Sequence, residues 1–430
     1  MAAPEENTAG AAAPAVATAS ADAITELLFV GVACTEAAIA ETVARHYGGR
    51  AEVRPQQHFD LAVAKALSQG CGVSAVSEPP VASYPRSSCV VYRRAPDRVS
   101  PTLEIRYLTV VNLPVIKTLL VSAGVLVEAL RFLLRAPRRR RAVVVGYISI
   151  HTALPVLILA RALGVPVLAI VPDLPRLVAT YGRIANPVRC LGAWALAACT
   201  RAVHHRFDAY VFLAPAMNSS INVLGRPFIV MEGMADEAAA GPVPADKLGC
   251  KVVMYAGTLH ERFGIRTLVE AFARPELREA ELWVYGNGDY EEQVRRMSTA
   301  HPNIVYKGTV SRADALKLER SVALLVNPRP SADELTMYSF PSKTIEYMAS
   351  GTPLVTTRLG AIPPEYGPYL YWFDDESPVG MARRISELLA QPPGALQAFG
   401  AAAREFVLRH KTAVAQGRRI LSLVSSVPGR

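Results

Sequence analysis

The stretch YSFPSKTIEYMASGTPLVTT, residues 338–357, predicts a short helix followed by a buried strand. Pro341 suits the first turn of a helix because its φ is already helical, and Gly351 can adopt the left-handed conformation that ends one. Apolar runs over residues 322–327 and 353–357 lie on either side of this helix. The unit therefore predicts one right-handed crossover of a parallel sheet, in which ligands bind at the carboxyl ends of the strands.

Two charged side chains stand in this predicted helix. Lys343 in the first turn adds a full positive charge to the free N–H groups of the helix start, and together they suit a diphosphate. Glu346, one turn later, suits the two hydroxyls of a ribose attached to that diphosphate. The alternative is an ordinary surface ion pair between the two residues, worth about 0.2–0.5 kcal/mol. These residues alone leave both interpretations open.

Length and composition favour two α/β domains. A chain of 430 residues exceeds one ordinary core, and it suits two domains of about 150–200 residues each. Hydrophobic residues make up 51% and charged residues 19%, with continuous apolar runs typical of strands buried on both faces of a parallel sheet. We expect a disordered tail over 1–22, a doubly wound domain over 23–234, a linker over 235–249, a second doubly wound domain over 250–405 and a crossover helix over 406–430.

The positive charge of the chain is concentrated in one place. Lys and Arg exceed Asp and Glu by nine, and the arginines cluster at Arg135 and then at Arg138, Arg139, Arg140 and Arg141. Such a patch attracts phosphate groups. No nucleic-acid-binding motif or aromatic interleaving accompanies it, so we expect an anionic membrane surface as the partner and no nucleic acid.

The segment that leads into the arginines is apolar for most of residues 114–134. Lys117, Glu128, Arg131 and Arg135 interrupt it at helical spacing, which predicts an amphipathic helix with a wide apolar face. Two interpretations stay open: a helix packed on the sheet, or one that also lies on a bilayer.

Cysteine usage indicates a reducing compartment. The six cysteines are scattered and form no C-x-x-C pair, which is typical of reduced thiols. We therefore expect a cytoplasmic protein, held peripherally at the inner face of the plasma membrane.

Three polar or glycine residues follow predicted strands of the first domain. Gly31 ends a short apolar run and would let the backbone turn tightly beneath a ligand, while His151 and Asp173 stand just beyond two later strands. A lone His or Asp in a loop is more often a turn or cap residue.

Four segments, one of them within the opening stretch, strengthen the interpretation of that stretch. They are residues 253–259 (VMYAGTL), 285–288 (YGNG), 340–343 (FPSK) with 346–348 (EYM), and 171–175 (VPDLP). In this order and spacing the chain resembles the retaining family 4 glycosyltransferases of GT-B fold, closest to the bacterial branch that builds capsule and exopolysaccharide. The resemblance implies two Rossmann-like domains facing a cleft, the first binding the acceptor and the second the nucleotide-sugar, with the C-terminal helix crossing back to the first domain.

The resemblance implies transfer of a sugar from a UDP- or GDP-linked donor to an acceptor hydroxyl, with retention and without a bound metal. Glu346 takes the place of the second glutamate of the family's Glu-x7-Glu pair, which holds the ribose. Tyr338 stands where the family has the first glutamate, and Asp333 and Glu334 are possible substitutes in the same loop. Pro341 and Ser342 complete the helix start that would receive the donor.

The family's phosphate-binding Arg and Lys map onto Thr258 and Phe263, which is a second departure. Arg262 and Lys343 are the nearest cations, and cations aimed at the leaving diphosphate lower the barrier in the way that oxyanion donors do. Arg262 is alternatively a solvated surface charge.

The resemblance makes Asp173 a candidate contact for the acceptor or the donor sugar, and His151 a weaker one. The glycine turns at Gly257 and Gly286, and the strand end at Val310, would lie near the base. The leading hypothesis is a membrane-associated glycosyltransferase that extends a lipid-linked glycan in surface polysaccharide assembly. A nucleotide-sugar epimerase of the same fold and a non-catalytic scaffold are the alternatives.

Overall fold

The computed structural model describes residues 24–47, 55–135, 141–146, 148–174, 199–200, 202–236, 239, 241–242 and 251–428. The predicted tail, most of the predicted linker, and Arg138, Arg139 and Arg140 lie outside these residues.

The first domain is built on an eight-stranded sheet that is parallel except at β4, which pairs antiparallel with β5. Its central strands are runs of Val, Leu, Ile and Ala, and β7 and β8 are buried along their whole length. In spatial order the strands are β10 (Phe228–Val230), β9 (Ala209–Phe212), β8 (Val167–Val171), β7 (Arg141–Val145), β1 (Glu26–Gly31), β2 (Gly72–Ser77), β5 (Leu103–Tyr107) and β4 (Asp97–Ser100).

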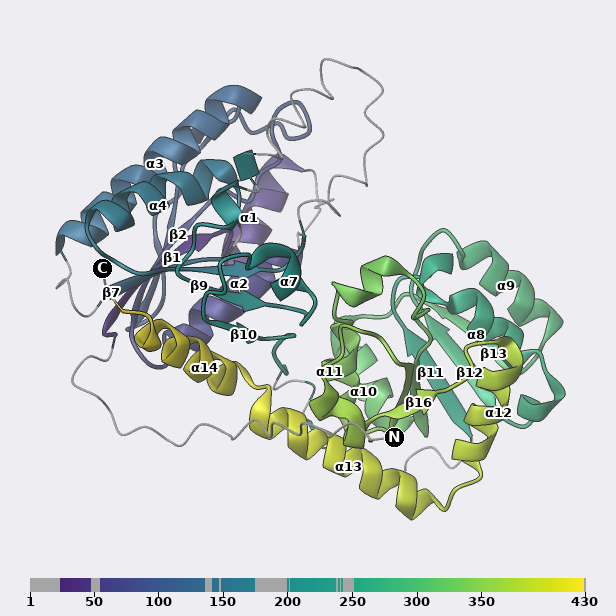
Figure 1. The fold of residues 1–430 in the computed structure, drawn as a ribbon. Coiled ribbons are helices and arrows are strands. Elements are labelled where there is room, and N and C mark those ends of the chain that lie inside the picture. The colour runs from purple at the N-terminus through teal and green to yellow at the C-terminus, as the bar shows by residue number, and fades with distance from the viewer. Residues whose placement is uncertain are drawn as a thin grey trace, which may run out of the picture.

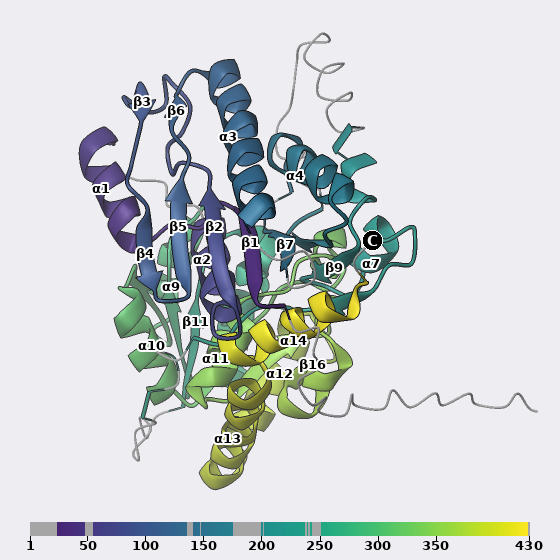
Figure 2. The ribbon, with the colours of Figure 1, turned by 90° about the vertical axis from the view of Figure 1, so that its left-hand side faces the viewer.

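Helices cover both faces of this sheet. They are α1 (Glu36–His46), α2 (Pro55–Leu67), α3 (Pro114–Arg135), α4 (Ile150–Ala162) and the short α7 (Met217–Ile221). Strands β3 (Val91–Tyr92) and β6 (Val110–Val111) form a separate two-stranded antiparallel sheet. Figures 1 and 2 show α3 and α4 side by side on one face. On the other face α2 packs against α14 (Ala413–Ser426). Their backbones approach closely at Gly417, where a Cβ would stand 2.5 Å from the carbonyl oxygen of Ala66.

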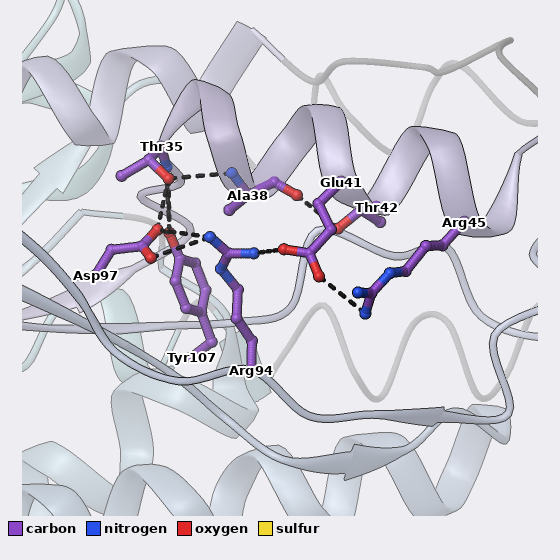
Figure 3. Close-up of polar contacts among 8 residues, drawn as sticks. All are labelled: Thr35, Ala38, Glu41, Thr42, Arg45, Arg94, Asp97 and Tyr107. Atoms are coloured by element: carbon purple, nitrogen blue, oxygen red, sulfur yellow. Dashed lines mark hydrogen bonds and ion pairs between the residues drawn. The ribbon is translucent and has the colours of Figure 1, made fainter.

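A polar network ties the start of α1 to the edge of the sheet (Figure 3). The hydroxyls of Thr35 and Tyr107 donate to the carboxylate of Asp97 at 2.6 and 2.9 Å, and Arg94 pairs with Asp97 at 3.0 Å and with Glu41. Burial raises the pKa of Asp97, but the hydrogen bonds from Thr35, Tyr107 and Arg94 outweigh it and hold that pKa below its usual value. The network fixes the outer strands against the first helix.

The second domain contains a six-stranded parallel sheet. In spatial order its strands are β13 (Ile304–Gly308), β12 (Glu281–Tyr285), β11 (Val252–Ala256), β14 (Leu324–Asn327), β15 (Leu354–Thr357) and β16 (Tyr371–Phe373). Its α-helices are α8 (Ile265–Phe272), α9 (Glu291–Ala300), α10 (Arg312–Ser321), α11 (Lys343–Ser350), α12 (Pro378–Leu389) and α13 (Pro393–His410). The 3₁₀ turns are η3 (Glu261–Phe263), η4 (Pro275–Leu277), η5 (Glu334–Met337) and η6 (Pro364–Tyr369).

The chain returns to the first domain through α14 (Figure 1). The predicted boundary of the crossover helix at residue 406 falls inside α13, which packs on α11 of the second domain. Two residues separate the helices, because Thr412 leaves the helical conformation and caps α14 by accepting the N–H of Ala415 at 3.2 Å.

A buried charge cluster lies where the chain passes between the domains. The ammonium of Lys411 lies 3.1 and 3.2 Å from the two carboxylate oxygens of Glu232, and the side chains of both residues are only 2% exposed. Lys411 also contacts Glu365, and the hydroxyl of Tyr366 donates to Glu232 at 3.4 Å. The backbone N–H of Ala235 donates to the carbonyl of Lys411 at 2.7 Å, so the two passes of the chain are joined at this point.

Candidate active site

The start of α11 is held in place by one tyrosine. The hydroxyl of Tyr347 donates to the carbonyl oxygen of Ala256 and accepts the N–H of the same residue, both at 3.0 Å, which anchors α11 to the end of β11. Gly351 ends the helix with φ 77°, in the left-handed conformation expected from the sequence. The helix start, with Pro341 and Ser342, is therefore fixed beside the carboxyl end of a central strand.

Lys343 and Glu346 contact each other in this first turn. The pair is not an ordinary surface pair, because the side chain of Glu346 is only 16% exposed. The ammonium of Lys343 also lies 3.6 Å from Glu319 of α10, whose side chain is 0% exposed. Arg312 lies 3.7 Å from the other oxygen of Glu346 and pairs with Asp236 at 2.7 Å. One lysine thus serves two carboxyl groups at the helix start.

The glycine turns after β11 and β12 interlock. The N–H of Gly257 donates to the carbonyl of Tyr285 at 3.0 Å, and the N–H of Gly286 donates to the carbonyl of Gly308 at 2.9 Å. Gly286 has φ 133°, and a Cβ there would stand 1.8 Å from the carbonyl oxygen of Gly257. Only glycine fits at Gly286, so the two turns stay close together at the strand ends. Val310, half-buried, follows on the next strand end.

Arg262 is already engaged by the loop that follows β14. Its guanidinium binds both oxygens of Asp333, with 2.9 Å between Nη2 and Oδ1. The hydrogen bond from Arg262 lowers the pKa of Asp333, so this carboxylate is charged at neutral pH. Tyr338, in the place of the family's first glutamate, is half-buried just after η5.

Arg329, in the loop that follows β14, is a second cation near Arg262. Its guanidinium lies 5.0 Å from the ring centroid of Phe263, and its Nη1 donates to the carbonyl of Ser339 at 3.5 Å. It therefore joins the turn after β11 to the segment that leads into α11.

In the first domain, the position of Gly31 is explained by a buried acid. A Cβ on Gly31 would stand 2.3 Å from Oδ2 of Asp60, and one on Gly146, at the end of β7, 3.0 Å from the same carboxylate. Asp60 is 0% exposed and accepts the N–H of Val32 at 2.8 Å. The space over Gly31 that the sequence suggested for a ligand is taken by Asp60.

His151 and Asp173 lie at different strand ends. Nε2 of His151, in the first turn of α4, is 3.7 Å from a carboxylate oxygen of Glu78, which lies 3.5 Å from the ammonium of Lys117. Asp173 follows β8 with an exposed side chain, and desolvation by the surrounding protein raises its pKa. Within the described part of the chain, no hydrogen bond or ion pair joins His151 to Asp173.

The arginine patch needs a correction at Arg141. We expected this side chain at a membrane surface, but Arg141 begins β7 and is buried, where its guanidinium donates to the carbonyl of Leu133 near the end of α3. Strand β7 lies in the middle of a sheet that helices cover on both faces, so even its first side chain is buried, and the free carbonyls of a helix end accept the buried donor. Arg138, Arg139 and Arg140 lie outside the described residues.

Sequence reasoning missed Glu319, Arg312, Asp236 and Arg329. For Glu319 a signal was present, because Ala315, Leu316 and Glu319 recur at the spacing of one helical face and all three are buried. Arg312 and Asp236 are brought to Glu346 only by the packing of the chain after β10 against α10, which local patterns do not report. Among the described residues, no group of three or more His, Cys, Asp or Glu lies together as a metal site.

Comparison with known proteins agrees with this architecture. Residues 250–391 match the family of glycosyl transferases group 1. No protein of curated function matches the sequence.

Three solved structures illustrate the likeness in fold. Sucrose-phosphate synthase from Thermosynechococcus elongatus has a TM-score of 0.60 at 15% identity and covers 93% of this chain and 98% of its own. Anabaena HepE, in complex with UDP, has a TM-score of 0.59 at 14% identity and covers 94% and 100%. The α,α-trehalose 6-phosphate synthase from Burkholderia multivorans has a TM-score of 0.59 at 14% identity and covers 94% and 97%. The chain therefore has the GT-B fold, and the match of its second domain to the group 1 glycosyl transferases supports a glycosyltransferase.

Proposed function

We propose that this protein transfers a sugar from a nucleoside diphosphate sugar to an acceptor hydroxyl with retention, as a member of family 4 in its bacterial capsule and exopolysaccharide branch. The observation that carries the proposal is the pair Lys343–Glu346 in the first turn of α11, held by Tyr347 beside the carboxyl end of β11. A cation and free N–H groups at a helix start receive a diphosphate, and a carboxylate one turn on receives ribose hydroxyls. The UDP complex of Anabaena HepE supports a nucleotide-linked donor.

In this proposal the donor lies along the strand ends of the second domain. The diphosphate meets Ser342 and Lys343, and the ribose meets Glu346. The base lies toward Gly257, Gly286 and Val310. The chain's own cations balance the charge that develops on the leaving diphosphate, so no metal is required. Asp173 is the proposed contact for the sugar or the acceptor.

The activity assay follows release of the nucleotide from UDP- and GDP-sugars, with and without a polyprenyl-diphosphate-linked sugar as acceptor. A transferase releases the nucleoside diphosphate only when the acceptor is present, and the new bond keeps the anomeric configuration of the donor by NMR. An epimerase would change the donor sugar without acceptor, and a scaffold would bind nucleotide without turnover. Either result contradicts the proposal.

The outer face of the first domain supports a lipid-linked acceptor. Two polar residues of α3 point inward: Lys117 is buried and donates to the carbonyl of Val81 at 2.7 Å, and Ser122 donates to the carbonyl of His151 at 2.9 Å. The outer face of α3 is apolar and continues onto α4. The large apolar side chains exposed there are Val115, Ile116, Leu119, Leu126, Val127, Leu130 and Leu134 of α3, with Leu154 and Ile158 of α4.

An exposed apolar face of this extent marks an interaction surface. Val115, Leu119 and Leu134 are 72%, 64% and 70% exposed. Arg131 and Arg135 stand at the end of α3, and the sequence continues with three further arginines. Apolar side chains bounded by arginines suit an anionic bilayer, where the former enter the acyl region and the latter meet lipid phosphates.

We therefore propose that the protein lies peripherally on the inner, cytoplasmic face of the plasma membrane and extends a lipid-linked glycan there. No helix among the described residues is both long and apolar enough to cross a bilayer.

Sedimentation with liposomes tests this membrane face. We expect binding to vesicles that contain phosphatidylglycerol, weakened by salt, and at least about tenfold weaker binding for the triple variant Val115→Ser, Leu119→Ser and Leu134→Ser, because three apolar side chains no longer enter the bilayer. Val223→Ser with Leu224→Ser is the matched control, since both residues are exposed in the loop between α7 and β10, outside α3 and α4. Equal binding of the triple variant and the control to the vesicles would contradict the proposal that this face binds a membrane. If the wild type is a dimer that the triple variant dissociates, the face instead binds a second copy of the chain.

A further inference from the structure

Glu319 lies beside the proposed donor site, and its carboxyl group has no role in the proposed binding of the donor. It lies on the inner face of α10, its side chain is 0% exposed, and neither of its oxygens accepts a hydrogen bond from the described residues. Its backbone carbonyl accepts the hydroxyl of Thr352 at 2.6 Å, so the end of α10 is fixed to the turn after α11.

Among the described residues, the charges nearest Glu319 belong to the donor site. Lys343 of α11 lies 3.6 Å away, and the same ammonium contacts the carboxylate of Glu346. Tyr347 of α11 lies near enough for Glu319 to raise its pKa. On its own helix, Arg312 is directed to Glu346 and Asp236 instead. Two carboxyl groups thus share one ammonium.

Burial raises the pKa of Glu319 to about 8; the charge of Glu346 adds to this rise and Lys343 opposes it. Glu319 therefore carries a proton at neutral pH and can act as a hydrogen-bond donor.

We propose that Glu319 is a positioning residue of the donor site: when a nucleoside diphosphate draws Lys343 to its diphosphate, neutral Glu319 donates its O–H to the carboxylate of Glu346 and holds it toward the ribose hydroxyls. This inference rests on the proposed function. Any Glu319 that is ionised before binding takes up one proton from solvent, since a buried carboxylate beside that of Glu346 does not stay charged once Lys343 has moved away from it. No covalent bond changes.

The inference predicts proton uptake on binding. Nucleotide affinity is level from pH 7 to about 8 and then falls by up to about tenfold per pH unit, because above its pKa Glu319 must be protonated to admit the ligand. Glu319→Gln keeps a donor toward Glu346 but carries no titrating proton. Its affinity therefore stays level to pH 9.

Titration calorimetry with UDP and with GDP at pH 8.5, in buffers of different ionisation enthalpy, counts the protons taken up. We expect between half a proton and one proton for the wild type and for the control Asp314→Asn, an exposed acid on the same helix, and none for Glu319→Gln. Glu319→Leu removes the donor and should bind at least about tenfold more weakly at pH 7.5, with its fold checked by circular dichroism.

The outcomes separate the two proposals. Proton uptake that persists in Glu319→Gln, or wild-type affinity in a folded Glu319→Leu, overturns the role of Glu319 and leaves the nucleotide site intact. If neither UDP nor GDP binds the wild type at any pH, the proposed function fails and this inference fails with it.

Discussion

Replacing Lys411 by Met tests whether the charge cluster between the domains stabilises the molecule. The substitution keeps most of the volume, and it leaves the carboxylate of Glu232 buried without its partner, since both side chains are 2% exposed. Removing one member of a buried pair costs about 3–5 kcal/mol. Glu365 contributes little to this figure because its side chain is 53% exposed and can be solvated after the change.

Hydrogen exchange at Ala235 is the most specific readout, because its N–H donates to the carbonyl of Lys411. A loss of about 3–5 kcal/mol raises its exchange rate by at least about a hundredfold. Lys317→Met, which breaks an exposed pair with Asp314, should change stability by less than about 1 kcal/mol. Adding Glu232→Leu to Lys411→Met should recover most of the loss, because the stranded charge is removed as well. A change in Lys411→Met no larger than that in Lys317→Met would refute the reasoning.

Two acids of the first domain should give opposite pH dependences of stability. Burial raises the folded-state pKa of Asp60 to about 7, so its contribution is full below its usual pKa and is lost as the pH rises through 7. Between pH 5.5 and 7 the wild type should lose about 2 kcal/mol relative to Asp60→Asn in urea unfolding, and parallel curves would contradict this. The hydrogen bonds to Asp97 lower its pKa, so its contribution is present above its usual pKa and is lost as the pH falls through the lowered value. Asp97→Asn should lower the free energy of unfolding by about 1.5–3 kcal/mol at pH 7, and it should reduce the loss of stability on acidification. An unfolding midpoint that equals the wild-type value at pH 7 and at acid pH would disprove the role of the network in Figure 3.

Helices and strands of the second domain follow closely from local pattern. The bounds of α8 and β12 agree with the apolar periodicity and the glycines beside them, and the unit from β14 to β15 folds as the crossover that residues 338–357 predict. These elements are short and bounded by turn residues, so the local sequence is enough to predict where each of them begins and ends.

Features that depend on long-range packing could not be found in this way. Arg141 belongs to a run of arginines, yet the chain turns inward at that residue and only the carbonyl of Leu133 makes its burial possible. Asp60 reads as an ordinary helix residue, and its place beneath Gly31 and Gly146 is set by three separate elements. The same holds for Lys411 and Glu232, which are far apart in sequence and meet where the domains join.

The central claim is that the first turn of α11 binds a nucleoside diphosphate. Titration calorimetry with UDP and GDP on the wild type, on Glu346→Ala and on the control Glu387→Ala, an exposed glutamate of α12, tests it directly. We expect the wild type and the control to bind one of the two nucleotides equally well, and Glu346→Ala to bind it at least about tenfold more weakly, because the ribose loses its charged hydrogen-bond acceptor. Unchanged affinity in Glu346→Ala would contradict the account.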